Sequence, residues 1–212
     1  MLQVFKKFFN RNELREKFTE VFKTNGFEGD ESISGKGSDL VQTRNLREEI
    51  PILIRKLNAK IFLDAPCGDF YWMDHVSMNH LSQYIGADIV KAIIRANNKK
   101  FKNQKRKFIC RDLTKDKLPK ADIVLCRDCL NHLSYMDSQR ILDNFRRSGI
   151  KYLLVTTFTS LKENTALNDQ FWRPLNLQLP PFNFPEPISL INEGCTENEG
   201  IYKDKSLGLW RL

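Results

Sequence analysis

Residues 62–70, FLDAPCGDF, constrain the fold more than any other stretch of this 212-residue chain. An apolar segment ends in Asp64, and a turn with a single glycine, Gly68, leads into a helix that we expect to start near Phe70. A second apolar segment, YIGAD, ends in Asp88. A strand, a tight turn, a helix and a second acid-tipped strand predict a nucleotide site at the carboxyl edge of a parallel sheet.

The acids in this turn limit the charge of the ligand. In the dinucleotide-binding fingerprint, three glycines let a pyrophosphate approach a helix N-terminus. Here the corresponding positions hold Pro66, Gly68 and Phe70, and Asp69 stands at the expected helix start. Such carboxylates would repel a pyrophosphate but suit a ligand with a ribose and a positive centre, such as S-adenosylmethionine. The alternative is an ordinary strand-to-helix turn with Asp69 as an N-cap.

The composition predicts one folded domain. The chain is 41% hydrophobic and 11% aromatic, which argues against disorder. It has no run of about 18 apolar residues, so no membrane span is expected. The N-terminal segment lacks the apolar core of a signal peptide, and we therefore expect a cytoplasmic protein.

The cysteine and charge patterns give only weak indications of disulfides, metal binding or nucleic-acid binding. Five cysteines, an odd number, do not suggest a disulfide framework. Cys126 and Cys129 lack a second pair at zinc-like spacing, so we expect buried thiols and no metal. The net charge of +8 permits nucleic-acid binding, but residues 99–107 (KKFKNQKRK) interleave only Phe101 and fit a solvated face better.

Hydrophobic periodicity predicts a helical leader over residues 1–32, followed by an alternating domain over 33–212. Leu14, Phe18, Val21 and Phe22 fall at helical spacing in the leader. After a glycine-rich loop at 33–39, a helix is expected over 40–57, broken at Pro51. Helices are further expected from about residue 70, over 90–98 and over 136–148. The expected strands are 61–65, 84–89, 107–111, 122–126, 152–157, 188–191 and 207–212.

This alternation of strands and helices predicts a doubly wound α/β fold with a mostly parallel sheet. Residues 158–187 interrupt the pattern with five of the eight prolines and several aromatic residues. Long loops inside a compact domain are usually functional, so we expect this one to approach the site.

Four acids follow successive predicted strands, at the edge where a ligand would bind. Asp88 can accept hydrogen bonds from both ribose hydroxyls, because a carboxylate has two acceptor oxygens. Asp112 can accept from the adenine amino group, with the Leu113 amide on a ring nitrogen. Asp64 can balance the sulfonium or the ammonium group, and Asp128 lies where the methyl group would be presented.

Several segments together resemble class I S-adenosylmethionine-dependent methyltransferases, and most closely one bacterial subfamily. The resemblance spans residue 33 to the end and leaves the leader uncovered. The segments are SGKGS (34–38), LDAPCGDFYWM (63–73), YIGADI (84–89), LCRDCLNHLS (125–134), WRPLN (172–176), PFNFPEP (181–187) and DKSLGLW (204–210).

The resemblance implies a seven-stranded sheet whose last strand is antiparallel. It also implies S-adenosylmethionine as cofactor, although Pro66 and Phe70 depart from the usual glycine-rich turn. Members occur in surface-polysaccharide and capsule gene sets, which points to a sugar, nucleotide-linked or phosphoramidate acceptor. The residues predicted to bind the cofactor are Ser38, Arg44, Arg47, Asp64, Ala65, Cys67, Gly68, Asp88, Ile89, Asp112, Leu113 and Arg127.

His132 is the predicted general base, with Asp128 as the second candidate. A helical turn after residue 126 would place these two residues on one face. An oxygen nucleophile can need such a base. The alternative for His132 is a buried histidine bonded to a backbone carbonyl.

Two further groups would complete the site. Arg44 and Arg47 could bind the methionyl carboxylate, since a fork-shaped donor suits it; the alternative is a solvated helix face. The residues predicted to bind the acceptor are Phe70, Trp72, Trp172, Arg173, Asn176 and Asn183.

The predicted function is methyl transfer to an oxygen of a small polar acceptor. One rival is an RNA or protein methyltransferase, which would need the basic run 99–107 at the rim of the site. The other rival is a non-catalytic partner subunit that binds the cofactor. The sequence leaves the acceptor and the oligomeric state open.

Overall fold

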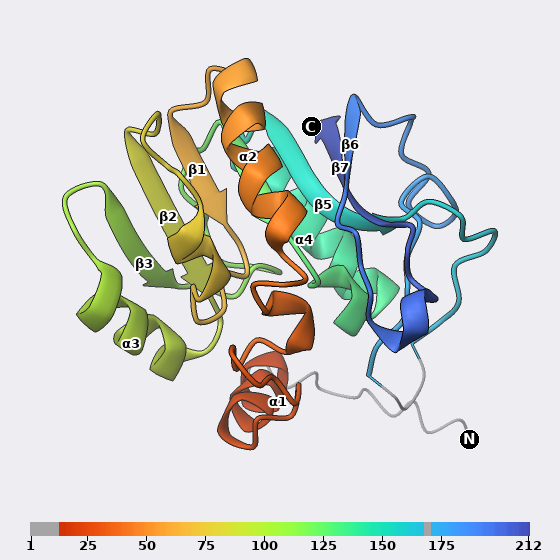
Figure 1. The fold of residues 1–212 in the computed structure, drawn as a ribbon, viewed down its shortest axis with the longest axis horizontal. Coiled ribbons are helices and arrows are strands. Elements are labelled where there is room, and N and C mark those ends of the chain that lie inside the picture. Colours follow the sequence, from red (N-terminus) through yellow and green to blue (C-terminus); the bar gives the residue numbers. More distant parts are fainter. Residues whose placement is uncertain (1–12, 168–170) are drawn as a thin grey trace, which may run out of the picture.

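The computed structural model describes residues 13–167 and 171–212, and Figure 1 shows them as one sheet flanked by helices. The helices are α1 (Glu13–Lys23), α2 (Arg44–Lys56), α3 (Lys91–Phe101) and α4 (Tyr135–Arg147). The strands are β1 (Ile61–Asp64), β2 (Gln83–Asp88), β3 (Arg106–Cys110), β4 (Ile123–Cys126), β5 (Tyr152–Phe158), β6 (Ser189–Asn192) and β7 (Lys205–Arg211). Short 3-10 turns lie at Lys36–Ser38, Trp72–His75, Leu130–His132 and Asn198–Gly200.

The sheet has the order β3-β2-β1-β4-β5-β7-β6, and β7 runs antiparallel to both of its neighbours. Asp64, at the end of β1, lies in register with Gly86 of β2 and Leu125 of β4. The carboxyl ends of these strands therefore meet at one edge of the sheet. The predicted seven-stranded, mostly parallel, doubly wound sheet is confirmed.

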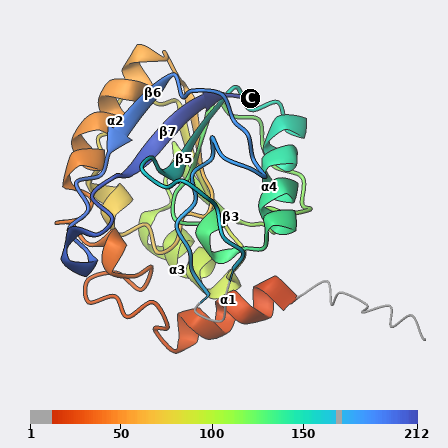
Figure 2. The same cartoon turned by 90° about the vertical axis from the view of Figure 1, so that its right-hand side faces the viewer.

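Alternating side chains supply a core on each face of the sheet. Phe62 faces the side covered by α2, where it packs in one cluster with Ile50. Leu63 faces the other side, in a cluster with Phe145 of α4. Figure 2 shows α2 and α4 on opposite sides of the sheet, and α1 across its lower end. Both faces of the central strands are thus buried, as expected for parallel strands.

Two predicted helices differ from the observed ones. The helix expected from Phe70 is only the 3-10 turn Trp72–His75, because Phe70 adopts a left-handed φ of 64° that cannot start an α-helix. The helix expected over 40–57 begins at Arg44 and continues through Pro51 without a break. Burial of Ile50 and Ile54 against the sheet offsets the cost of the proline.

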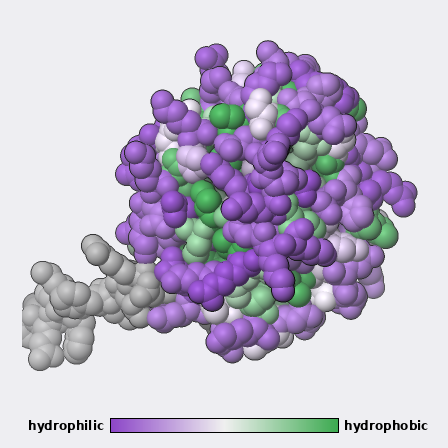
Figure 3. Space-filling model, turned by 90° about the vertical axis from the view of Figure 1, so that its left-hand side faces the viewer, coloured by the Kyte–Doolittle hydropathy of each residue, from purple (hydrophilic) through white to green (hydrophobic). Residues whose placement is uncertain are grey.

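The loop between β5 and β6 packs onto the core that contains Leu63 and Phe145. Residues 168–170 of this loop lie outside the described part of the chain. Phe182 contacts Tyr135 of α4, and Phe184 contacts Trp210 of β7, both edge to face. Among the described helices, none combines the length and hydropathy that a membrane span requires. The face shown in Figure 3 is mostly hydrophilic, with hydrophobic side chains gathered in a recess.

Candidate functional site

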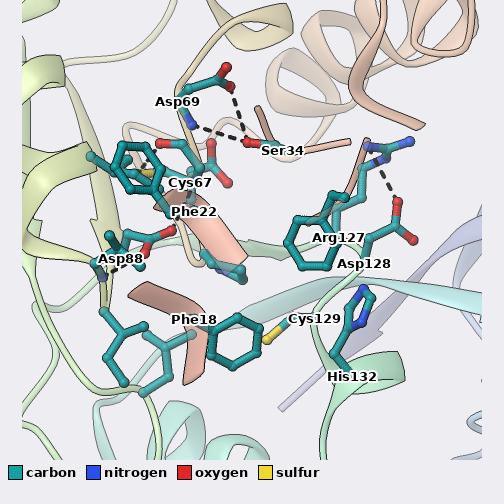
Figure 4. Close-up of a pocket in the computed structure, with 18 of the residues that line it drawn as sticks. Phe18, Phe22, Ser34, Cys67, Asp69, Asp88, Arg127, Asp128, Cys129 and His132 are labelled. Carbon is teal, nitrogen blue, oxygen red and sulfur yellow. Dashed lines mark hydrogen bonds and ion pairs between the residues drawn. The ribbon is translucent and has the colours of Figure 1, made fainter. Parts of the chain in front are cut away.

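A pocket lies at the carboxyl edge of the sheet, between the strand ends and the overlying α1 (Figure 4). All four strand-end acids line it, so the residues predicted to meet at this edge do lie around one cavity. The predicted site residues that line the pocket are Ser38, Asp64, Cys67, Gly68, Trp72, Asp88, Ile89, Asp112, Leu113, Arg127, Asp128 and His132.

The turn after β1 forms part of the pocket wall, where Cys67 and Gly68 line the cavity. The Cys67 N–H donates to Ala87 O at 2.9 Å, which ties the turn to β2. Gly68 has a φ of +50°, and a Cβ at this position would lie 2.2 Å from Ser34 Oγ. Only glycine therefore fits this position. Asp69 does not cap an α-helix here, since the segment after it forms only a 3-10 turn.

Asp88 ends β2 and is almost fully buried in the pocket wall. Its Oδ2 accepts from the Gly68 N–H at 3.2 Å, and its Oδ1 accepts from the Val90 N–H at 2.9 Å. Each oxygen keeps a further lone pair for a ligand hydroxyl. Burial raises the pKa of Asp88 to about 6.

Two more carboxyls flank this position with different charge states. Burial raises the pKa of Asp64 to about 7, although Tyr84 donates its hydroxyl to Asp64 Oδ2 at 2.5 Å. Burial alone would raise the pKa of Asp112, but hydrogen bonds from Thr114 and Lys115 hold it below its usual value. Asp112 is thus ionised near neutral pH, whereas Asp64 titrates there.

A largely buried network of charged side chains lies beside the pocket at the end of β4. Arg127 donates to Glu193 Oε2 and to Gly37 O, both at 2.7 Å. Lys205 Nζ lies 2.7 Å from Asp128 Oδ2, and Arg127 lies 3.4 Å from the same oxygen. Burial would raise the pKa of Asp128, but Lys205 and Arg127 lower it to about 2. Asp128 therefore stays ionised and has little affinity for a proton.

His132 has the protonation state of a neutral base. Its Nδ1 lies 2.8 Å from Phe171 O, and a carbonyl can only accept, so Nδ1 carries the proton. Nε2 is left with a lone pair, and burial lowers the pKa of the ring. Asp128 adopts a left-handed φ of 47° and precedes the 3-10 turn that carries His132, so the expected α-helical turn does not form.

The structure places the other predicted site residues outside the pocket lining. Arg47 donates to Leu40 O at 2.9 Å. Phe70 packs among the rings of Tyr84, Phe101 and Phe108. The remaining predicted residues outside the lining are Arg44, Ala65, Trp172, Arg173, Asn176 and Asn183.

Three of these side chains, all carried by the long loop, have structural partners. Arg173 donates to Leu133 O at 2.9 Å and lies over the Tyr135 ring, 4.5 Å from its centroid. Trp172 stacks edge to face on Phe158 and Tyr202. Asn176 Nδ2 donates to Leu161 O at 3.2 Å.

Sequence reasoning missed the contribution of the leader. Leu14, Phe18, Phe22 and Phe27 line the pocket opposite the strand ends. The helical spacing of the first three was visible in the sequence, but spacing cannot say what an apolar stripe covers. Glu193 was also missed, since no local pattern marks a partner 66 positions from Arg127.

Comparisons with known proteins agree with this geometry. Residues 63–150 match the family model of a methyltransferase domain. No curated protein matches the sequence significantly. Many solved structures share the fold, among them the following three.

The first is 1,6-didemethyltoxoflavin-N1-methyltransferase from Burkholderia thailandensis, solved with 1,6-didemethyltoxoflavin and S-adenosylhomocysteine. It is 15% identical with a TM-score of 0.62, over 93% of this chain and 86% of that chain. The N-methyltransferase NodS from Bradyrhizobium japonicum is 11% identical with a TM-score of 0.61, over 91% and 97%. Human N-acetylserotonin methyltransferase is 14% identical with a TM-score of 0.61, over 92% and 58%.

Proposed function

Because this chain is an S-adenosylmethionine-dependent methyltransferase, we propose that it methylates a hydroxyl oxygen of a small polar acceptor. The acceptor class that we propose is a sugar, nucleotide-linked or phosphoramidate intermediate of surface-polysaccharide synthesis. The observation that carries the choice of oxygen is His132, a partly buried neutral imidazole that lines the pocket and whose Nε2 keeps its lone pair. A hydroxyl nucleophile must lose a proton, and this atom can take it.

The residues of the pocket fit the cofactor. Asp88 offers one free lone pair on each oxygen for the two ribose hydroxyls, and the tight turn at Gly68 lets the backbone come close. Asp112 and Leu113 would hold the adenine, and Asp64 would face the positive centre. When bound, S-adenosylmethionine supplies an electrophilic methyl carbon, whereas a pyrophosphate would meet repulsion from these acids.

In this proposal the protein positions the acceptor and removes its proton. His132 Nε2 takes the hydroxyl proton as the oxygen bonds to the methyl carbon and the carbon–sulfur bond breaks. Phe171 O holds the imidazole in the required tautomer. Asp128, kept ionised by Lys205 and Arg127, stabilises the imidazolium that forms. Its pKa of about 2 makes Asp128 a poor base, which favours His132 over the second candidate.

The basic run 99–107 does not support the RNA-methyltransferase rival. It lies at the end of α3 and the start of β3, and none of its residues lines the pocket. Nitrogen remains the alternative target atom, because two of the structural neighbours are named as N-methyltransferases. An amine acceptor that is already neutral needs no base, so His132 distinguishes the two chemistries.

Release of S-adenosylhomocysteine with a panel of acceptors tests this proposal. The panel should hold nucleotide-linked sugars, phosphorylated sugars, amino sugars and short RNA. We expect turnover with hydroxyl acceptors, and we expect His132→Gln to lower kcat by about 100-fold, the low end for general-base catalysis. The KM for S-adenosylmethionine should not change. His75→Gln, at an exposed position, serves as the control. Unchanged kcat in His132→Gln, or turnover of amines or RNA alone, would contradict the proposal.

Cofactor affinity should rise with pH. Asp88 has a pKa of about 6 in the unliganded protein, and ribose hydroxyls need the carboxylate, so binding expels its proton. As pH rises toward about 6, the contribution of Asp88 should lower Kd roughly tenfold per pH unit, and this contribution should level off above about pH 7. The raised pKa also means that the stability contributed by the protonated Asp88 is lost as pH rises through about 6. Titration calorimetry between about pH 5 and pH 8 measures the first effect.

Asp88→Asn supplies the control for this pH dependence. The asparagine amide does not titrate, so the change of Kd with pH around pH 6 should disappear. Any change of Kd near pH 7 that comes from Asp64 should remain. A wild-type Kd that stays constant or rises between pH 5 and pH 7 would contradict the assignment of Asp88 to the ribose.

A further inference from the structure

We propose that α1 is a movable lid of the cofactor site, and that Phe18 and Phe22 contact the bound cofactor directly. The inference rests on the cofactor and is independent of the acceptor. Three observations carry it: the placement of the aromatic side chains, the loose docking of α1, and a hinge that is anchored on the cofactor turn itself.

The placement of the aromatic side chains comes first. Phe18 and Phe22 project into the middle of the pocket, with Phe22 beside Cys67 and Asp88 and Phe18 beside Cys129 (Figure 4). The strand side of the lining offers acids and aliphatic side chains such as Leu113. With α1 in place the free volume is about 150 Å³, below the roughly 300–1,000 Å³ of typical ligand pockets. The Phe18 and Phe22 side chains take up part of this space, so we expect α1 to move when a cofactor of this size enters.

The docking of α1 is loose enough for such a movement. None of its residues is buried, whereas α2 and α4 each bury five. Leu14 and Phe18 are only partly buried against the second core. One face of α1 thus presents apolar side chains to the pocket and packs only partly against the core, and low burial permits local opening.

The segment after α1 has the features of a hinge with a fixed end. Asn25 and Glu28 adopt left-handed φ values of 48° and 52°, and this stretch includes Gly26 and Gly29. Beyond it, the chain is fastened to the turn that carries Gly68. Asp69 accepts from Ser32 Oγ at 2.9 Å, from the Ile33 N–H at 3.1 Å and from Ser34 Oγ at 3.1 Å.

This anchor gives the lid a direct connection to the cofactor. Residues 32–34 end the hinge and also contact the turn that carries Gly68, which lines the pocket. Residues 13–24 can then swing about this hinge while 32–34 stay in place. When the lid closes on the bound cofactor, the Phe18 and Phe22 rings supply flat apolar surfaces for its adenosine. Stacking of a base on an aromatic ring is favourable for every base, adenine included.

The test compares Phe18→Ala/Phe22→Ala with Glu16→Ala/Glu20→Ala, which changes the exposed face of the same helix. The aromatic variant should bind S-adenosylmethionine roughly 5- to 100-fold more weakly, the range for loss of base stacking, and should release it faster. The control variant should bind like the wild type. Circular dichroism checks that both are folded, which we expect because α1 buries no residue.

Hydrogen exchange supplies an independent readout in the unmodified protein. Amides of Glu13–Lys23 should exchange more slowly once S-adenosylmethionine is bound, because the lid then closes on a ligand. The lid proposal would be wrong if the aromatic variant bound S-adenosylmethionine as tightly as the wild type or more tightly. It would also be wrong if hydrogen exchange in α1 did not change at saturation with S-adenosylmethionine. If the wild type did not bind S-adenosylmethionine at all, the cofactor assignment itself would be wrong, and the lid proposal that rests on it would fail as well.

Discussion

Asp88→Ala should weaken the binding of S-adenosylmethionine by roughly 100- to 10,000-fold. Asp88 is the one carboxylate at the end of β2, and it is held in place by the Gly68 and Val90 amides. Two ribose hydroxyls would each lose a hydrogen bond to a charged acceptor, at about 1.5–3 kcal/mol apiece. The sum of about 3–6 kcal/mol gives the stated range at tenfold per 1.4 kcal/mol. Isothermal titration calorimetry measures Kd.

Two variants control this result. Asp88→Asn keeps the size and one acceptor oxygen but removes the charge, so its Kd should fall between those of Asp88→Ala and the wild type. Asp143→Ala removes an exposed carboxylate on α4 and should leave Kd unchanged. An Asp88→Ala protein that is folded and binds within about threefold of the wild type, less than one ordinary hydrogen bond, would contradict the assignment.

Arg127→Met should lower the free energy of unfolding by about 3–5 kcal/mol, the usual cost of removing one partner of a buried ion pair. The side chains of Arg127 and Glu193 are only 6% and 2% exposed, and their atoms lie 2.7 Å apart. Methionine fills the space but leaves the Glu193 carboxylate buried, with Lys205 at 3.6 Å as its remaining cation. Urea denaturation followed by circular dichroism measures the loss.

A double-mutant cycle separates the pair from the loss of either side chain alone. Arg127→Met/Glu193→Gln removes both charges, so it should regain part of the stability that Arg127→Met loses. Arg146→Met breaks the exposed pair with Asp143, whose side chains are 42% and 51% exposed; it should cost at most about 0.5 kcal/mol. A loss below about 1 kcal/mol in Arg127→Met would show that the buried network contributes little.

The sheet and the cofactor edge could be predicted because local pattern determines them. Short apolar runs separated by helical stretches fix parallel strands, and the residue after a parallel strand always lies at the carboxyl edge. Asp64 and Asp88 are the last residues of β1 and β2, Asp112 and Asp128 lie two residues beyond β3 and β4, and all four line the pocket. The predictions of a methyltransferase and of S-adenosylmethionine as its cofactor are confirmed as well.

The remainder depends on contacts between distant residues. Arg47 and Arg173 looked like ligand-binding cations, but each bonds a backbone carbonyl of a neighbouring segment, which no spacing rule can show. The left-handed conformations of Phe70 and Asp128 replaced two expected helical turns, because tertiary packing overrides propensity at such positions. The leader showed its apolar stripe in the sequence, yet only the fold shows that the stripe faces the cofactor pocket.

The central claim is that the acid-tipped strand ends form a site for S-adenosylmethionine, and calorimetric titration of the whole chain tests it most directly. S-adenosylmethionine should bind saturably at one site, S-adenosylhomocysteine should compete for that site, and NAD should give no binding, because its pyrophosphate would face the carboxylates of the turn. A folded protein that binds no S-adenosylmethionine, or that binds NAD at the same site, would contradict the account.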